Sequence, residues 1–291
     1  MVIAVASGKG GTGKTTIATS FALSLALDRD IQLVDCDVEE PNAHLFLDPL
    51  VIEKTSKGFI PVPQIDQSKC NYCGKCSKVC AYNAIAVVGP KDGRKGSILV
   101  FEQLCHGCGA CSFLCPRGAI KEVNREIGAV ESGWSGPIQF IHGRLNIGEA
   151  MAPPLIRQVK ENIDPSKTVI IDAPPGTSCP VVTSVEKSDF CILVTEPTPF
   201  GLNDLILAVE VLRKLKIPFG VVLNRSDLGN EDTEKYCVQE NISILMRVPF
   251  DEKVAKSYSK GIPIVRALPE FKNHFKQLYE KIDNILTGKD R

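Results

Sequence analysis

The sequence lacks a long apolar run, an excess charge of either sign and a recognisable export signal. Its 291 residues carry 34 Lys and Arg against 34 Asp and Glu, so the formal net charge is zero. A balanced charge argues against coating nucleic acid through bulk electrostatics, and we expect no nucleic-acid partner. No apolar run approaches the roughly 18 residues that a membrane span needs, and no charged region precedes the apolar N-terminal residues. These absences predict a cytoplasmic protein with no membrane partner.

Cysteine is the residue present in excess. The chain has 12 Cys, and without an export signal so many thiols indicate metal or redox chemistry in a reducing compartment rather than disulfides. Eight of them form two copies of the motif C-x2-C-x2-C-x3-C. These are Cys70, Cys73, Cys76 and Cys80 in the first copy, and Cys105, Cys108, Cys111 and Cys115 in the second.

This spacing is that of bacterial ferredoxins that hold two 4Fe–4S clusters. In that arrangement the fourth cysteine of each copy ligates the other cluster, because the chain has turned into a helix by then. The predicted ligand sets are therefore Cys70, Cys73, Cys76 and Cys115 for one cluster, and Cys105, Cys108, Cys111 and Cys80 for the other. The alternative is a zinc site, although zinc is typically bound by two C-x2-C pairs separated by a longer loop. Residues 62–126 resemble a two-cluster ferredoxin, except that Ala81 stands where the ferredoxin pattern has proline.

A phosphate-binding loop follows the first predicted strand, residues 2–6. Residues 8–15 satisfy G-x4-G-K-[ST], and an apolar helical pattern comes after them. The backbone N–H groups of such a loop close around phosphate oxygens at a helix N-terminus. We expect Lys14 to reach the β- and γ-phosphates and the Thr15 hydroxyl to ligate Mg²⁺; the alternative is a glycine-rich turn without function. The predicted nucleotide-binding residues of the loop are Gly8, Lys9, Gly10, Gly11, Thr12, Gly13, Lys14, Thr15 and Thr16.

A second lysine at the start of the loop, Lys9, gives the longer pattern K-G-G-x-G-K-[ST]. This pattern resembles the deviant Walker motif of the MinD/ParA superfamily, which also contains the nitrogenase iron protein and the Mrp-type cluster carriers. The resemblance implies dimerisation on ATP, as a homodimer or as a heterodimer with a related ATPase. It also implies that Lys9 reaches the nucleotide of the opposite subunit. A solvated lysine without this role is the alternative.

Further segments resemble landmarks of the same superfamily, in the expected order. Residues 33–37 resemble switch I, which implies that Asp37 positions the attacking water and that Asp35 lies in the outer shell of the magnesium ion. Residues 169–176 resemble the Walker B and switch II segment, which implies that Asp172 holds Mg²⁺ through water. Asn224 and Pro249 resemble adenine-binding positions. The implied cofactors are ATP or ADP, Mg²⁺ and two 4Fe–4S clusters, and the implied catalytic residues are Lys9, Lys14 and Asp37.

Predicted strands alternate with predicted helices in the pattern of a doubly wound, mostly parallel α/β sheet. The strands are 2–6, 31–35, 168–172, 190–195, 218–223 and 243–247, and the helices include 14–27, 201–215 and 251–259. Junctions with the ferredoxin-like segment are predicted at Pro61-Val62-Pro63 and at the glycines between Gly128 and Pro137. The predicted domains are a P-loop NTPase domain, residues 1–60 and 127–291, and an inserted α+β ferredoxin-like domain, residues 61–126.

Together these motifs predict a slow, partner-stimulated MinD-like ATPase. Its dimerisation and switch motion would be coupled to electron transfer through two 4Fe–4S clusters, with a redox or metallocluster protein as partner. Two alternatives stay open: an iron–sulfur assembly or carrier ATPase, and a ParA/MinD-like positioning or complex-assembly protein with structural clusters. Mrp-type carriers bridge a cluster with a late C-x-x-C, and no such pair lies outside residues 70–115. The apolar stripe in residues 271–286 is expected to pack on the ATPase body.

Overall fold

The computed structural model describes residues 1–92 and 95–288, and the chain divides into two compact units. The first unit comprises Met1–Ser56, Val130–Arg144 and Ile156–Arg291, and the second comprises Lys57–Ala129 and Leu145–Leu155. Among the described residues, no helix combines the length and the apolar character that a membrane crossing requires.

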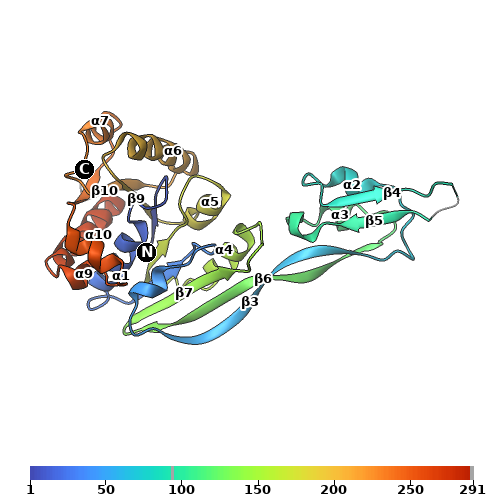
Figure 1. Cartoon of the computed structure of the whole chain (residues 1–291), viewed down its shortest axis with the longest axis horizontal. Helices are drawn as coiled ribbons and strands as arrows, with labels where there is room; N and C mark the ends of the chain where they lie inside the picture. Colours follow the sequence, from blue (N-terminus) through green and yellow to red (C-terminus); the bar gives the residue numbers. More distant parts are fainter. Residues whose placement is uncertain (93–94, 289–291) are drawn as a thin grey trace. The chain divides into compact units, whose positions relative to one another are not determined.

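The sheet of the first unit has the strand order β11-β10-β9-β1-β8-β2-β7-β6-β3 (Figure 1). All pairings from β11 to β7 are parallel, so their carboxyl ends meet at one edge, where ligands bind in such sheets. The six predicted strands are confirmed to within one residue at each end. They are β1 (Val2–Ala6), β2 (Ile31–Asp35), β8 (Thr168–Asp172), β9 (Phe190–Thr195), β10 (Phe219–Asn224) and β11 (Ile244–Val248).

Helices cover both faces of this sheet (Figure 1). On one face lie α1 (Lys14–Leu25), α9 (Ile264–Ala267) and α10 (Phe271–Thr287). Their apolar side chains, including Phe21 and Phe275, form one buried cluster with strand residues such as Ile3. The expected packing of the C-terminal stripe on the body of the unit is thereby confirmed. The remaining helices are α4 (Pro153–Lys160), α5 (Cys179–Val185), α6 (Pro199–Leu215), α7 (Asp232–Gln239) and α8 (Glu252–Tyr258), with a short 3-10 turn at Ala43–Phe46.

Three further strands of this sheet lie between β2 and β8 in the chain and were not among the predicted sheet strands: β3 (Val51–Ile65), β6 (Ile120–Ser135) and β7 (Ile138–Leu145). The chain is extended at the predicted junctions, because β3 and β6 run through Pro61-Val62-Pro63 and Gly133, and the two compact units change at Ser56/Lys57 and Ala129/Val130. Proline is tolerated in β3 because this strand ends the sheet order, where a missing N–H need not interrupt a ladder. Gly133 is required by close approach, since an added Cβ would overlap the Val51 carbonyl oxygen.

The second unit contains α2 (Lys75–Val79), β4 (Ile85–Val88), β5 (Ser97–Val100), a 3-10 turn at Glu102–Leu104 and α3 (Ala110–Phe113). Strands β4 and β5 pair antiparallel, and α2 packs against α3. The backbone conformation of this unit repeats at an offset of 35 residues, as left-handed φ angles at matching positions show. The matching pairs are Tyr72 and Gly107, Gly74 and Gly109, and Asn83 and Gly118. The two cysteine motifs are therefore two copies of one local structure.

Candidate functional site

The phosphate-binding loop joins the end of β1 to the start of α1. Gly13 caps the helix in the left-handed region, at φ 90°, and an added Cβ would overlap the Asn224 amide nitrogen. Gly8 is equally constrained, since a Cβ there would overlap the backbone of Asp204 in α6. Glycine is therefore needed at both positions by packing and, at Gly13, also by conformation. The amide nitrogen of Asn224 donates a 2.8 Å hydrogen bond to the Thr12 carbonyl, which fixes the loop to the end of β10.

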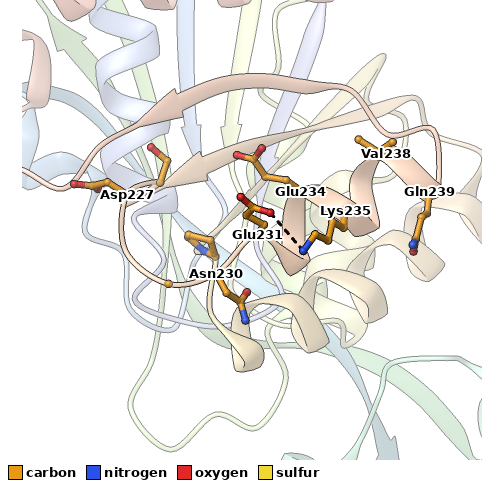
Figure 2. A pocket seen from close by; sticks show the side chains of 10 residues that line it. Asp227, Asn230, Glu231, Glu234, Lys235, Val238 and Gln239 are labelled. Atoms are coloured by element: carbon orange, nitrogen blue, oxygen red, sulfur yellow. Dashed lines mark ion pairs between the residues drawn. The ribbon is translucent and has the colours of Figure 1, made fainter.

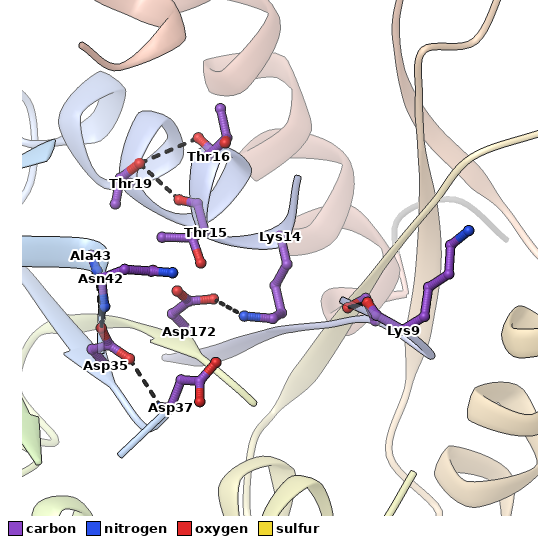
Figure 3. Close-up of polar contacts among 11 residues, drawn as sticks. Lys9, Lys14, Thr15, Thr16, Thr19, Asp35, Asp37, Asn42, Ala43 and Asp172 are labelled. Carbon is purple, nitrogen blue, oxygen red and sulfur yellow. Dashed lines mark hydrogen bonds and ion pairs between the residues drawn. The ribbon is translucent and has the colours of Figure 1, made fainter. Parts of the chain in front are cut away.

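A buried ion pair lies behind this loop. The Lys14 ammonium is 2.9 Å from Oδ1 of Asp172, and the two side chains are 7% and 0% exposed (Figure 3). Burial alone would lower the pKa of Lys14, but the charge and hydrogen bond of Asp172 outweigh it, so the pKa is raised. Among the described residues, Oδ2 of Asp172 has no hydrogen-bond partner although it is buried. A buried carboxylate oxygen left without a donor suits a cation or its water shell.

Asp35 organises the loop after β2. Its Oδ1 accepts a hydrogen bond from the backbone N–H of Asp37, and its Oδ2 accepts from those of Asn42 and Ala43, at 3.0, 3.1 and 3.0 Å (Figure 3). Burial and the nearby charge of Asp172 raise the pKa of Asp35. The side chain of Asp37 is half-buried, and burial, opposed by Lys14 and reinforced by Asp172, raises its pKa to about 6. Asp35 thus holds the backbone that carries Asp37.

A cleft of about 450 Å³ opens in front of the loop. Ten predicted residues line it: Lys9, Gly10, Gly11, Gly13, Lys14, Thr15, Thr16, Asp37, Asn224 and Pro249. Gly8, Thr12, Asp35 and Asp172 are not among its lining residues, and the last of these reaches the site through Lys14. The volume is in the range of ordinary small-ligand sites.

One wall of the cleft begins at the predicted adenine-binding segment around Pro249, but its residues on α8 were missed by the sequence analysis. Phe250, Val254, Ala255 and Tyr258, from the loop after β11 and from α8, line it together with Arg225. Arg225 takes a left-handed φ of 51° and forms a 2.7 Å ion pair with Glu196. Residues 250–258 read FDEKVAKSY and mix charged with apolar residues, so no apolar run indicated this wall, although its apolar side chains suit the face of a purine base.

Lys9 lines the cleft but does not face its buried charges. Figure 3 shows its side chain pointing away from Lys14 and Asp172. The Ser7 hydroxyl donates a 2.7 Å hydrogen bond to the Lys9 carbonyl and so fixes the backbone there. The ammonium of Lys9 is thus directed away from the phosphate loop of its own chain.

A second hollow, of about 590 Å³, is acidic and differs from this cleft (Figure 2). Its acids are mostly compensated, since Glu231 lies 3.4 Å from Lys235 and Glu234 lies 3.0 Å from Arg247. It is lined by Pro197, by the loop after β10 and by α7, not by the phosphate-binding loop. None of the described residues that line it belongs to a glycine-rich phosphate loop, so the nucleotide chemistry belongs to the other cleft.

His142 is a further buried polar residue that the sequence did not indicate. It stands beside Asp35 in the register of β2 and β7, and its Nε2 lies 2.8 Å from Oε2 of Glu131. Burial lowers its pKa, although Glu131 opposes this effect. Its Nδ1 has no hydrogen-bond partner among the described residues.

The eight motif cysteines gather around two hollows in the second unit. The first hollow is lined by Cys70, Cys73, Cys76 and Cys115, and the second by Cys80, Cys105, Cys108 and Cys111. We refer to these as the first and second thiol sets. Each set thus combines three cysteines of one motif with the fourth of the other.

Backbone N–H groups donate to sulfur in both sets, again as a repeat. In the first set the donors are Tyr72 N to Cys70 and Ala119 N to Cys115, both at 3.3 Å. In the second they are Gly107 N to Cys105 at 3.5 Å and Ala84 N to Cys80 at 3.2 Å. Such bonds stabilise thiolates and tune the potential of iron–sulfur centres. The donor set therefore fits a thiolate-ligated cluster in each hollow.

As they stand, no three His, Cys, Asp or Glu side chains in residues 1–92 and 95–288 converge closely enough to hold a single metal ion. The thiols of each set are instead distributed around their hollow. Of the other cysteines, Cys36, Cys191 and Cys237 are buried and Cys179 is exposed. Burial raises the pKa of Cys36 to about 12, so it stays a thiol at neutral pH.

The sheet order, the phosphate-binding loop and the carboxylates behind it define a nucleotide-binding α/β protein. The chain belongs to the CobQ/CobB/MinD/ParA nucleotide-binding domain family, whose model matches residues 3–264. Its fold is similar to that of the septum site-determining protein MinD of Pyrococcus horikoshii, solved with Mg-ADP. The TM-score is 0.59 at 19% identity, over 98% of this chain and 96% of MinD.

Relatives with similar sequences cover nearly the whole chain. One is the uncharacterized protein MJ0578 of Methanocaldococcus jannaschii, 32% identical over 288 residues and 98% of each chain. Another is the iron-sulfur cluster carrier protein of Pyrococcus horikoshii, 26% identical over 310 residues, or 98% of this chain and 86% of the relative.

Proposed function

We propose that this protein binds and hydrolyses MgATP and couples the resulting dimerisation and switch motion to electron transfer through two 4Fe–4S clusters. The observation that carries the proposal is the pairing of a complete phosphate-binding site with two complete thiol sets in one chain. Neither feature alone would suggest that ATP hydrolysis is coupled to electron transfer, because phosphate-binding sites and cluster-binding motifs each also function on their own in other proteins.

The nucleotide site supports hydrolysis of a bound triphosphate. Lys14 would exchange Asp172 for the β- and γ-phosphates, and the free Asp172 carboxylate would then hold Mg²⁺ through water, with the Thr15 hydroxyl as a direct ligand. Asp35 would keep the loop in place around the outer shell of the ion. Asn224 and Pro249 would border the adenine, although the Asn224 amide is also engaged by Thr12 and Arg225.

Asp37 suits the role of positioning the attacking water. Its pKa of about 6 places it near the operating pH, where a group can both accept and release a proton. Lys9 would act on the nucleotide of the opposite subunit, which its direction away from its own site supports. ATP would then bridge two copies of the chain, or this chain and a related ATPase.

The thiol sets would supply the ligands for the two clusters. A bound 4Fe–4S cluster exchanges single electrons, usually at low potential. The chain itself contributes eight thiolates and four backbone N–H donors to sulfur. A redox or metallocluster protein would be the partner on the other side of the exchange.

An iron–sulfur carrier function is the second candidate, because several relatives bear the name iron-sulfur cluster carrier protein. A carrier must release its cluster, whereas each set here provides four thiols from two motifs and so holds its ligand from both sides. The structure of the second unit therefore supports retention more than release.

The two candidates are separated by one anaerobic experiment. Protein with its iron and sulfide quantified would be titrated potentiometrically with and without MgATP, and then mixed with an apo-ferredoxin. We expect nucleotide to shift the potentials or the electron-transfer rate while the clusters stay bound. If MgATP leaves the reduction potentials unchanged and iron and sulfide are rapidly transferred to the apo-protein, the carrier function is favoured. Lys9→Ala should abolish ATP-dependent dimerisation, and a variant that still dimerises would contradict the role of Lys9.

A further inference from the structure

The two thiol sets are copies of one local structure, so differences between equivalent positions show what distinguishes their surroundings. Each set has one exposed ligand, Cys73 in the first and Cys108 in the second, and these two are 35 residues apart. The other cysteines of the sets are only partly exposed. The surface around Cys73, which we call the first mouth, and that around Cys108, the second mouth, are therefore equivalent places on the repeat.

The first mouth is basic. Lys75 and Arg117 line its hollow, and both are exposed. In the part of the chain that the structure describes, neither of these two forms an ion pair. Arg117 is held in place by a 3.5 Å hydrogen bond from its Nε to the Lys69 carbonyl, which leaves the rest of the guanidinium exposed. No acidic residue is among the described residues that line this hollow.

The second mouth is aromatic and acidic. The position equivalent to Lys75 holds Ala110, and the position equivalent to Arg117 holds Tyr82. Tyr82 stacks on His106 with ring centroids 3.3 Å apart and an interplanar angle of 6°. The carboxylate that lines this hollow belongs to Glu122.

No described Lys or Arg lines the second hollow. Arg125 lies within electrostatic reach of Cys105, but both of its terminal nitrogens contact the Glu149 carboxylate, at 2.5 and 2.9 Å. Its charge is thereby compensated. The repeat thus presents two equivalent cluster approaches with opposite character, and among the described residues that line them only the first has unpaired positive charge.

We propose that the first mouth is the docking site for a one-electron carrier protein with an acidic surface, and that the second mouth does not bind it. The proposal rests on the proposed function, since it takes the thiol sets as cluster ligands. Two exposed cations beside an exposed ligand would steer an acidic protein to that ligand, because complementary charge sets encounter rate and orientation. At the second mouth, the Tyr82–His106 stack and Glu122 offer no positive charge that would attract an acidic protein or orient it.

The test measures binding of an oxidised acidic flavodoxin to the full, cluster-loaded chain at two salt concentrations. Lys75→Ala/Arg117→Ala removes both cations of the first mouth. Lys121→Ala, on β6 in the same unit, is exposed and lines neither hollow, so it gives the effect of removing one positive charge outside both mouths. Ala110→Lys gives the second mouth the lysine that its equivalent position has. Iron and sulfide are quantified on every variant.

We expect the double variant to bind about three- to tenfold more weakly at low salt, with the difference shrinking as salt rises. Lys121→Ala should bind nearly as the parent does, and Ala110→Lys should strengthen binding. A basic redox protein such as a cytochrome c should bind the parent no better than the double variant.

Two results would overturn the docking proposal. One is equal weakening by Lys121→Ala and the double variant, which would show only a net-charge effect. The other is loss of flavodoxin binding on Phe113→Ala, the exposed aromatic between Cys111 and Cys115 of the second motif, with no effect of the double variant. If iron and sulfide are absent from the parent, the proposed function fails and the docking site with it. If they are present and binding ignores Lys75 and Arg117, only the docking site fails.

Discussion

The buried pair of Lys14 and Asp172 makes a quantitative prediction for the nucleotide-free protein. Removing one partner of a buried pair costs about 3–5 kcal/mol, because the other charge is left without compensation. Lys14→Met leaves Asp172, which is 0% exposed, beside Asp35 and Asp37, so we expect a loss in this range. Asp172→Asn should cost less, about 1–3 kcal/mol, because Asp35 and Asp37 still attract the lysine.

The pair also predicts that the losses in the free energy of unfolding caused by the two substitutions do not add. The double variant Lys14→Met/Asp172→Asn removes both charges together, so its cost should fall short of the sum of the single costs by about 1–3 kcal/mol. The matched control is Lys256→Met, which breaks an ion pair with Glu252 at 74% and 75% exposure and should cost at most about 1 kcal/mol.

The measurement is urea unfolding at neutral pH without nucleotide or Mg²⁺, followed by tryptophan fluorescence. The chain has one tryptophan, Trp134, and it lies in the first unit, so its signal reports on the unit that contains the pair. If Lys14→Met costs no more than Lys256→Met, or if the single costs simply add, then the pair is not the buried, coupled interaction described above.

Three further predictions concern the loop, the buried histidine and the thiols. Gly13→Ala should abolish nucleotide binding measured by calorimetry, because its φ is 90° and its Cβ would overlap an amide; Gly89→Ala, with open space around it and outside the cleft, should bind normally. Because the pKa of His142 is lowered by burial, the unfolded chain takes up its proton more readily below pH 6.5, so the free energy of unfolding should rise with pH up to that value. His142→Gln should flatten this slope in urea titrations, and an unchanged slope would assign it to other groups. Cys73→Ala should reduce bound iron by about half, whereas Cys191→Ala, at a buried strand position, should retain it; equal iron in both variants would exclude the first thiol set as a cluster site.

The six predicted strands were recognisable because each is a short, apolar and β-branched run that ends at a polar residue or turn. Strands β3 and β6 were not recognisable as strands of the sheet, because Pro61 and Pro63 and the glycines near Gly133 have the composition of loops. Their strand conformation depends on position at the end of the sheet and on close packing against a neighbouring backbone, which are tertiary properties.

For the candidate site, too, the spacing of residues along the chain was predictive, whereas contacts that depend on the tertiary structure could not be predicted. Fixed spacing within one loop or motif indicated the phosphate-binding residues and the two thiol groupings. It could not indicate that Asp35 holds the backbone of Asp37 and Ala43, since an aspartate at a strand end can equally bind a metal ion or a loop. The wall containing Phe250 and Tyr258 lies far along the chain from the loop that it faces, so no local pattern connects them.

The packing of α1 against α10 has a consequence for the order in which the chain can fold during synthesis. Phe21 of α1 lies 6.2 Å, between ring centroids, from Phe275 of α10, so the helix that carries the phosphate-binding loop is covered by a segment that is synthesised 254 residues later. At about 5–20 residues per second, the apolar side of α1 waits on the order of tens of seconds for its cover. Nascent chains that stop before α10 would expose this side, which makes them candidates for chaperone binding and leaves the nucleotide site without its supporting core.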